Sequence, residues 1–447
     1  MSAPVSDLIG APSRIRAARA VRAEGVVVRV VGLAVESQGP ASAIGEECLI
    51  ESGDGTILSR ALVVGFSGNR VFTMPVDRLH GLAVGARVVA LGSRPTMGVG
   101  AHLLGRVLDA DGRPLDGRPL AEPEARYPLE SAAPPAMNRE RIREPFVTGV
   151  RSLDGFTTVG RGQRLGIFAG SGVGKSTLLG MIARHAKADV AVIALVGERG
   201  REVRDFIEED LGKEGLAHAV VIVATSDEPP LRRIRAAQAA TAVAEYFRDQ
   251  RRHVVLLMDS ITRVAMAQRE VGLSLGEPPS TKGYPPSVFS LLPRLVERAG
   301  AVRDEGSITG LYSVYVEGDD LNDPVADAAR SLLDGHVVLT RELAGRGHYP
   351  AVDVLGSVSR LMPQIASVEH LGAVRALRSR LAAMKEAEDL VLLGAYREGA
   401  SPEVDAALRS RDAVREFLVQ SKERGSPLEA TVDGLSRCVA SGNGAAS

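Results

Sequence analysis

The stretch that decides the fold is Ala169-Gly170-Ser171-Gly172-Val173-Gly174-Lys175-Ser176-Thr177, a glycine-rich turn between the apolar run 165–168 and an apolar segment that begins at Thr177. Glycines let a backbone curl until its N–H groups converge on phosphate oxygens, and the N-terminus of the following helix adds positive potential. Lys175 is placed to reach the outer phosphates, and Ser176 to ligate Mg²⁺. The strict pattern has glycine where Ala169 stands, at the position furthest from the phosphates. We predict a P-loop in which residues 170–177 bind a nucleoside triphosphate.

Length and composition indicate a globular protein of more than one domain. The chain has 447 residues, 45% of them hydrophobic, which is too many for one ordinary core. Because residues 1–10 lack the features of a signal peptide and no apolar run could cross a bilayer, we expect a soluble, cytoplasmic protein. Cys48 and Cys438 have no partner motif, which favours inert packing over a disulfide or a metal site. A net charge of −1 argues against a nucleic-acid surface over the whole molecule.

Residues 1–24 form a basic N-terminal segment. Arg14, Arg16, Arg19 and Arg22 follow one another with no acid between them, and apolar residues recur three apart. This pattern fits a short amphipathic helix that docks on a partner or on an anionic membrane surface. It fits a frayed, solvated terminus equally well, and both interpretations stay open.

The next two segments predict a small β-barrel and a linker. Residues 25–98 contain valine-rich runs such as 25–31, 56–64 and 86–91, which glycine and aspartate turns separate. Short strands of this kind are typical of an all-β barrel. Residues 99–144 are rich in proline and are expected to link the barrel to the next domain.

The rest of the chain predicts an α/β domain followed by helices. Within 145–365, strand-like runs such as 190–196, 219–224 and 254–258 alternate with helix-length segments. Such alternation means a mostly parallel sheet covered by helices, with the site at the carboxyl ends of the strands. Residues 366–447 show helix-length stretches instead, so we expect a helical C-terminal domain.

Charged residues at the ends of these runs are candidates for the chemistry. Asp259 ends the buried run 254–258, where a carboxylate can hold Mg²⁺ through its water shell, although it could also cap the next helix. Glu198 follows the run 190–196 and is placed to activate water, whereas Glu202 falls in the first turn of a helix. Arg360, after the last β segment, could neutralise charge on a transferred phosphoryl group or form a surface salt bridge.

The segment 350–359, Pro-Ala-Val-Asp-Val-Leu-Gly-Ser-Val-Ser, resembles the signature decapeptide of the rotary-type ATPases, the family of the ATP synthase α and β subunits. The likeness extends over most of the chain, through Leu104-Gly105-Arg106-Val107-Leu108-Asp109, Gly197-Glu198-Arg199, Ala224-Thr225-Ser226-Asp227 and Glu317-Gly318-Asp319-Asp320-Leu321. Within the family, Gly276 to Phe289 resembles the protein-export branch, which comprises flagellar export ATPases and their type III secretion counterparts. That segment, rich in proline and glycine, is expected to be an irregular loop facing the central channel of a ring, or else a rigid surface loop.

The resemblance assigns roles to individual residues. It makes Lys175 the phosphate-binding lysine, Ser176 the magnesium ligand, Glu198 the water-activating carboxylate and Asp259 the aspartate of the magnesium shell. Arg360 becomes an arginine finger inserted into the neighbouring subunit's site. Arg199 resembles a residue that helps to hold the γ-phosphate region, and Tyr349 resembles the aromatic that packs against adenine, with core packing as the alternative for Tyr349.

The resemblance also implies a homohexameric ATPase that uses ATP and Mg²⁺ and energises protein export. Its partners would be a regulatory protein bound by the N-terminal segment, a central stalk-like export protein, a membrane-embedded export gate, and export substrates with their chaperones. It would work in the cytoplasm, peripherally at the export apparatus of the inner membrane. A virulence-type secretion ATPase is the nearest alternative to flagellar export.

Two further alternatives belong to other classes. A hexameric nucleic-acid translocase shares this core, but the near-neutral charge and only 4% aromatic residues weigh against it. A non-catalytic nucleotide-holding subunit, similar to the ATP synthase α chain, would have glutamine where Glu198 stands. Glu198 therefore favours a subunit that hydrolyses ATP.

Overall fold

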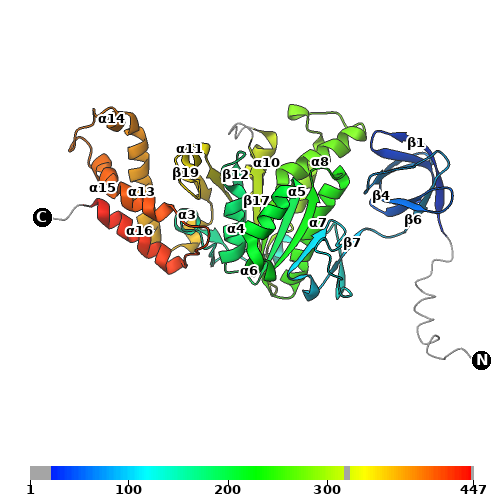
Figure 1. Cartoon of the computed structure of the whole chain (residues 1–447), viewed down its shortest axis with the longest axis horizontal. Helices are drawn as coiled ribbons and strands as arrows, with labels where there is room; N and C mark the ends of the chain where they lie inside the picture. Colours follow the sequence, from blue (N-terminus) through cyan, green and yellow to red (C-terminus); the bar gives the residue numbers. More distant parts are fainter. Residues whose placement is uncertain (1–21, 317–322, 444–447) are drawn as a thin grey trace, which may run out of the picture. The chain divides into compact units, whose positions relative to one another are not determined.

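Short valine-rich strands close the N-terminal part of the chain into a six-stranded barrel, drawn in blue in Figure 1. The computed structural model describes residues 22–316 and 323–443 and divides into two units between Pro95 and Thr96. The barrel order is β1-β2-β5-β4-β3-β6. Its strands are β1 (Glu24–Val31), β2 (Ala34–Gln38), β3 (Glu47–Glu51), β4 (Ile57–Ser67), β5 (Arg70–Pro75) and β6 (Arg87–Ala90). Alternate side chains such as Ala61 and Val63 point inward and fill the barrel, as the period of a strand requires.

The second unit is built on a nine-stranded, mostly parallel sheet. Along the main path the order is β19-β18-β12-β17-β15-β13-β14-β8; β19 pairs with β18 antiparallel, and the short β16 pairs antiparallel with β17. The strands are β8 (Arg106–Asp109), β12 (Arg164–Ala169), β13 (Val190–Glu198), β14 (Ala219–Thr225), β15 (His253–Asp259), β16 (Gly300–Ala301), β17 (Ser307–Tyr315), β18 (Gly335–Leu339) and β19 (Val352–Ser359). The central strands are continuous apolar runs because helices bury both of their faces.

The predicted alternation of strands and helices is confirmed in this sheet. The helices between its strands are α4 (Lys175–His185), α5 (Gly200–Asp205), the π-helical turn η3 (Phe206–Leu211), α6 (Gly212–Ala217), α7 (Pro230–Asp249), α8 (Ile261–Ser274), α9 (Pro286–Val296), α10 (Pro324–Leu332) and α11 (Arg341–Gly345). Gly276 to Phe289 was expected to be irregular throughout, and this is wrong for its last residues. Pro286 to Phe289 form the first turn of α9, because proline is favoured at the first helical position.

Residues 99–144, expected to be a linker, belong to the second unit. Besides β8, the segment carries β9 (Ala125–Pro128), which pairs with β7 (Thr96–Val99), and the 3-10 turns η1 (Ala101–Leu103) and η2 (Ala136–Asn138). Strand β8 adds to the edge of the central sheet by pairing with β14. Ion pairs hold the turn after β8 on α7: Arg232 contacts Asp109 at 2.6 Å, and Arg235 contacts Asp111 at 2.7 Å.

Helices close the C-terminal end of the second unit. They are α12 (Met362–Ile365), α13 (Val368–Glu386), α14 (Glu388–Leu392), α15 (Pro402–Leu418) and α16 (Leu428–Gly442); Figure 1 shows α13, α15 and α16 packed together. Their apolar side chains join the same core cluster as the sheet, in part through α3 (Arg151–Phe156), where Phe156 meets the ring of Phe417 edge-on. A small sheet of β10 (Pro145–Phe146) and β11 (Val159–Gly160) flanks α3.

Two sequence expectations fall outside the described residues. These are the basic segment, apart from Arg22 to Glu24, and the run Glu317 to Leu321. Within 22–316 and 323–443, no helix is long and apolar enough to span a membrane.

Candidate active site

The glycine-rich turn 170–174 connects β12 to α4, at the carboxyl edge of the sheet. Gly172 and Gly174 have φ angles of 78° and 88°, in the left-handed region that glycine adopts without strain. Val173 is buried and anchors the loop, whereas Ser171 and Gly172 are exposed. A Cβ atom on Gly172 would meet no other atom within 4 Å, so the turn borders open space. This is the shape of a loop whose backbone amides can receive a phosphate group.

Lys175, Glu198 and Asp259 come together beside this loop, as the sequence predicts. Lys175 begins α4, and its Nζ lies 2.5 Å from Oδ1 of Asp259 and 3.7 Å from Oε1 of Glu198. The two carboxylates end β15 and β13, which are neighbours in the sheet. Because all of these strands are parallel, their carboxyl ends meet at one edge.

Burial and neighbouring charge shift the pKa values of this cluster. Burial raises the pKa of Glu198 to about 7, helped by the negative charge of Asp259 and opposed by Lys175. Burial alone would lower the pKa of Lys175, but the charges of Asp259 and Glu198 outweigh it and raise that pKa. A carboxyl group with a pKa near neutrality is suited to accept a proton in a reaction at physiological pH.

Asp259 is not the cap of the following helix. That cap is Ser260, whose Oγ accepts a hydrogen bond from the amide of Arg263. The Asp259 carboxylate is 2% exposed and faces the cluster, where Oδ1 also accepts a hydrogen bond of 2.6 Å from Oγ of Ser313. Ser313 lies on β17, between β12 and β15 in the sheet. Sequence reasoning missed Ser313, because a serine inside a buried strand belongs to no motif.

Gly197 allows Glu198 to reach the site. The β13–β14 register shifts between Val196 and Glu198, and Gly197 in between has a φ of 73°. A Cβ atom on Gly197 would lie 3.0 Å from Cβ of Arg263, on α8. Arg263 also acts electrostatically, lowering the pKa values of both Glu198 and Lys175. It is a second residue of the site that the sequence did not indicate.

Arg199 and Tyr349 flank the site in different ways. Arg199 caps α5 with an exposed side chain that lies 3.8 Å from Glu202, so it is not drawn into the cluster. The Tyr349 side chain is 46% exposed, which excludes simple core packing. Its ring lies 3.4 Å from the position of a Cβ on Gly174, next to the P-loop. An exposed aromatic ring at this place can stack on a flat ligand.

Arg360 is not brought to the P-loop of its own chain. Strand β19 runs antiparallel to β18, so that Val352 is level with Leu339 and the carboxyl edge, whereas Ser359 is level with Gly335 at the opposite edge. The amide of Arg360 donates to the carbonyl of Asp334, whose own amide donates to Arg164 at the start of β12. Ala169, the last residue before the P-loop, lies five residues along β12 from Arg164, which is roughly 17 Å.

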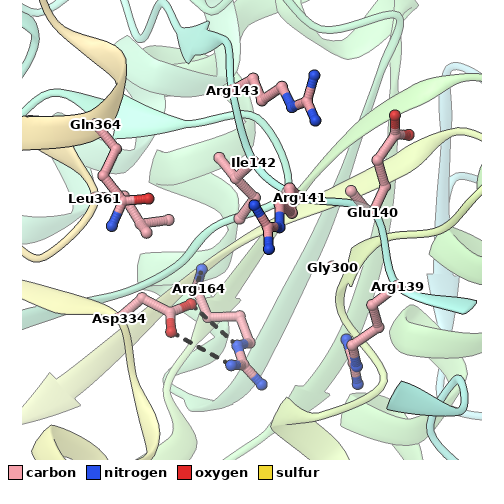
Figure 2. A pocket seen from close by; sticks show the side chains of 12 residues that line it. Arg139, Glu140, Arg141, Ile142, Arg143, Arg164, Gly300, Asp334, Leu361 and Gln364 are labelled. Atoms are coloured by element: carbon pink, nitrogen blue, oxygen red, sulfur yellow. Dashed lines mark hydrogen bonds and ion pairs between the residues drawn. The ribbon is translucent and has the colours of Figure 1, made fainter. Parts of the chain in front are cut away.

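A basic pocket of about 470 Å³ lies at this opposite edge, and none of residues 170–177 lines it. Figure 2 shows Arg141, Arg143 and Arg164 around it, with Leu361 and Gln364 on the other side. Asp334 pairs with Arg164 in its floor. Because Leu361 and Gln364 follow Arg360 in the sequence, the pocket lies next to the segment that carries Arg360.

Family models match three parts of the chain. The β-barrel domain of the ATP synthase alpha/beta family matches residues 27–92, and the nucleotide-binding domain of that family matches residues 149–359. The C-terminal domain of the type III secretion ATPase EscN matches residues 366–437.

Curated relatives match nearly the whole chain. A flagellum-specific ATP synthase of Bacillus subtilis is 52% identical over 92% of this chain and 94% of its own length. A type 3 secretion system ATPase of Xanthomonas euvesicatoria is 49% identical over 92% and 93%.

Solved structures show the same fold. The assembled ATPase EscN of enteropathogenic E. coli, from its type III secretion system, superposes with a TM-score of 0.88 at 43% identity over 93% of this chain and 100% of its own. EscN in complex with its central stalk EscO gives a TM-score of 0.86 at 42% identity, over the same shares of the two chains.

Proposed function

This chain belongs to the ATP synthase alpha/beta family, and from that premise we propose that it is an ATPase that energises flagellar protein export through a site shared between subunits. The observation that carries the proposal is the contact of Lys175 with both Asp259 and Glu198 at the carboxyl edge of the sheet. A lysine, a strand-end aspartate and a carboxyl group with a raised pKa are the parts that phosphoryl transfer to water needs.

The residues around the P-loop have separate tasks in this proposal. Residues 170–177 bind the phosphates through backbone amides and Lys175. Glu198 orients the attacking water and accepts its proton as the bond to phosphorus forms, while ADP takes the electrons of the broken P–O bond. Tyr349 stacks on the adenine ring, and Arg199 supports the γ-phosphate region from the rim.

The site also fits Mg²⁺. Ser176 supplies an exposed hydroxyl, and Asp259 supplies a buried carboxylate whose Oδ1 faces the cluster. Among the described residues there is no group of three or more His, Cys, Asp or Glu that could hold a metal ion. Mg²⁺ suits such a site because it takes few protein ligands and keeps phosphate oxygens and waters. When bound, it would neutralise charge on the β- and γ-phosphates.

Arg360 completes the site of a neighbouring subunit. Its position at the edge opposite its own P-loop supports action in trans, and an arginine of this kind is worth roughly 1,000- to 100,000-fold in rate.

We propose a homohexamer that works in the cytoplasm at the inner-membrane export apparatus. A stalk-like protein would occupy the channel of this ring, and the complex of EscN with its central stalk EscO supports such a partner. Export substrates, chaperones, an export gate and a regulatory protein would be the other partners.

Replacing Glu198 by glutamine tests the catalytic assignment. Glu198→Gln should abolish ATP hydrolysis while nucleotide binding stays close to wild type, since only the group that accepts the proton is changed. Fluorescent nucleotide binding and phosphate release measure the two properties. Unchanged turnover would remove Glu198 from the mechanism.

A virulence-type secretion ATPase is the second candidate, favoured by the match of residues 366–437 to the EscN C-terminal domain. Deletion of the gene in its own organism distinguishes the two. Loss of flagella and swimming supports flagellar export, whereas normal flagella with loss of another secreted set supports the alternative.

A further inference from the structure

Strand β12 has two functional ends. Its carboxyl end leads into the P-loop, and its amino end lies against the segment that carries Arg360. The Arg360 side chain is exposed, and within residues 22–316 and 323–443 its guanidinium donates a single weak hydrogen bond, of 3.3 Å, to the carbonyl of Arg330. The direction in which Arg360 points is therefore set mainly by its backbone.

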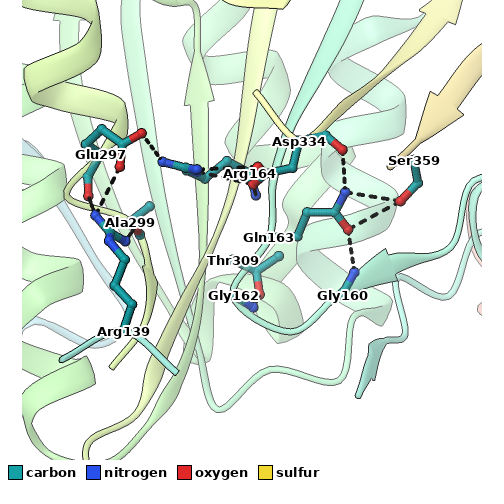
Figure 3. Close-up of polar contacts among 10 residues, drawn as sticks. All are labelled: Arg139, Gly160, Gly162, Gln163, Arg164, Glu297, Ala299, Thr309, Asp334 and Ser359. Carbon is teal, nitrogen blue, oxygen red and sulfur yellow. Dashed lines mark hydrogen bonds and ion pairs between the residues drawn. The ribbon is translucent and has the colours of Figure 1, made fainter. Parts of the chain in front are cut away.

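Gln163, directly before β12, holds that backbone. Figure 3 shows its amide bridging two segments: Nε2 donates to the carbonyl of Asp334 at 3.0 Å and to Oγ of Ser359 at 3.1 Å. Its Oε1 accepts from the amide of Gly160 at 2.7 Å, which fixes the orientation of the side chain. Gln163 is fully buried, so these bonds have no competition from solvent. The carbonyl of Asp334 also accepts the amide of Arg360 at 3.0 Å.

The Asp334 side chain is fixed in turn by Arg164. Oδ2 accepts from the amide and from Nε of Arg164 at 3.1 and 3.2 Å. Arg164 also pairs with Glu297, and Arg139 holds Glu297 from the other side at 3.1 Å. The chain of contacts from Arg139 to Asp334 thus leaves the carbonyl of Asp334 little freedom.

We propose that Gln163 and Asp334 are positioning residues for Arg360, holding it in the direction that serves the neighbouring subunit. This inference rests on the proposed function, in which Arg360 acts in trans. Neither residue touches nucleotide in this scheme. Loss of the Gln163 amide should leave nucleotide binding intact and reduce turnover, because Arg360 spends less time in the productive orientation.

The test is the variant Gln163→Leu, which keeps the size of the side chain and removes its hydrogen bonds. We expect kcat to fall about tenfold, as for the loss of one or two oriented hydrogen bonds, with unchanged nucleotide affinity. Mixed with Lys175→Ala protein, it should gain activity above the sum of the two separate proteins, because the Lys175→Ala subunits supply a well-placed Arg360. Mixed with Arg360→Ala protein, it should gain none.

The reverse pattern, recovery with Arg360→Ala and none with Lys175→Ala, would place the defect in the chain's own nucleotide site and overturn the proposal.

Thr309→Val is the matched control. Oγ1 of Thr309 accepts a hydrogen bond from the amide of Gly162 beside β12 and makes none to Asp334 or Ser359, so this variant should keep full turnover. If Gln163→Leu fails to fold, Ser359→Ala removes the bond to Ser359 alone and should show the same mixing pattern with a smaller loss.

A mixture of Arg360→Ala with Lys175→Ala tests the proposed function separately. Recovery of activity in that mixture supports an arginine in trans, whatever the behaviour of Gln163→Leu. No recovery where mixed rings assemble would count against the shared site itself. Recovery there, together with wild-type kcat for Gln163→Leu, would reject only the positioning role.

Discussion

At the scale of single residues, the ionisation of Glu198 should govern how the reaction depends on pH. Its pKa is raised to about 7 by burial and by Asp259, against the opposing charges of Lys175 and Arg263. In the proposed mechanism the ionised form accepts the proton, so kcat/KM, which reports the free enzyme, should rise about tenfold per pH unit below pH 7 and level off above it. Steady-state ATP hydrolysis, measured in separate assays at pH values between 5.5 and 8.5, gives this dependence of kcat/KM on pH.

Asp205→Asn is the control for the pH profile. Asp205 lies on the same helix, α5, as the half-buried Glu202, but its own side chain is exposed and pairs with Arg201 at 3.7 Å. Its loss should leave the midpoint near 7. A flat profile for the wild type, with chemistry rate-limiting, would contradict Glu198 as the proton acceptor.

The sequence was sufficient for those candidate site residues that stand in motifs or at strand ends. Lys175, Glu198 and Asp259 each end or begin an element at one sheet edge, so pattern alone brings them together. Ser313 and Arg263 could not be found in this way. Their roles depend on which strand lies between β12 and β15 and on which face of α8 meets Gly197, and both are set by tertiary packing.

At the scale of elements, long apolar strands and the short barrel strands between regular turns were predictable from the sequence, whereas β8 was not. Strand β8 spans only Arg106–Asp109, and its partner β14 begins more than a hundred residues later in the chain. Nothing in a four-residue run marks it as a sheet edge. Its place is given by its pairing with β14 and by the ion pairs of α7 with Asp109 and Asp111, and these contacts exist only in the folded chain.

Helix α3 offers a prediction about stability. The buried carboxylate of Asp154 accepts hydrogen bonds from the amide and hydroxyl of Thr148 at 2.9 and 2.7 Å and from the amide of Gly149 at 2.9 Å. Asp154→Asn turns one acceptor into a donor facing these donors. We expect a loss of about 1–3 kcal/mol and a lower urea midpoint for the unit that contains the sheet.

Glu144→Gln is the comparison for Asp154→Asn. Glu144 is largely exposed and pairs with Arg161 at 3.0 Å, so its loss should change the free energy of unfolding by less than about 0.5 kcal/mol. Equal midpoints for the two variants would mean that the buried acceptor contributes little to the anchoring of α3.

At the scale of the whole molecule, the proposed function gives one chain two half-sites, which lie at opposite edges of one sheet. Strand β19 leads from Tyr349, beside the P-loop, to Arg360 at the far edge. The sequence predicted that Arg360 follows the last strand, but not the edge at which it lies, because direction within a sheet depends on the antiparallel pairing of β19 with β18. Only the family resemblance suggested an arginine in trans.

Two half-sites on one chain predict that turnover depends on assembly. An isolated subunit has Lys175 and Glu198 but no Arg360 within reach of its own P-loop, so it should hydrolyse ATP slowly. Specific activity should therefore climb with protein concentration and level off where rings form, as measured by ATPase assays alongside light scattering. Arg360→Ala protein should assemble over the same range without the climb, because its interfaces lack the guanidinium. A specific activity that stays constant while the scattering mass increases would mean that each subunit is catalytically complete, and the shared site would then have to be abandoned.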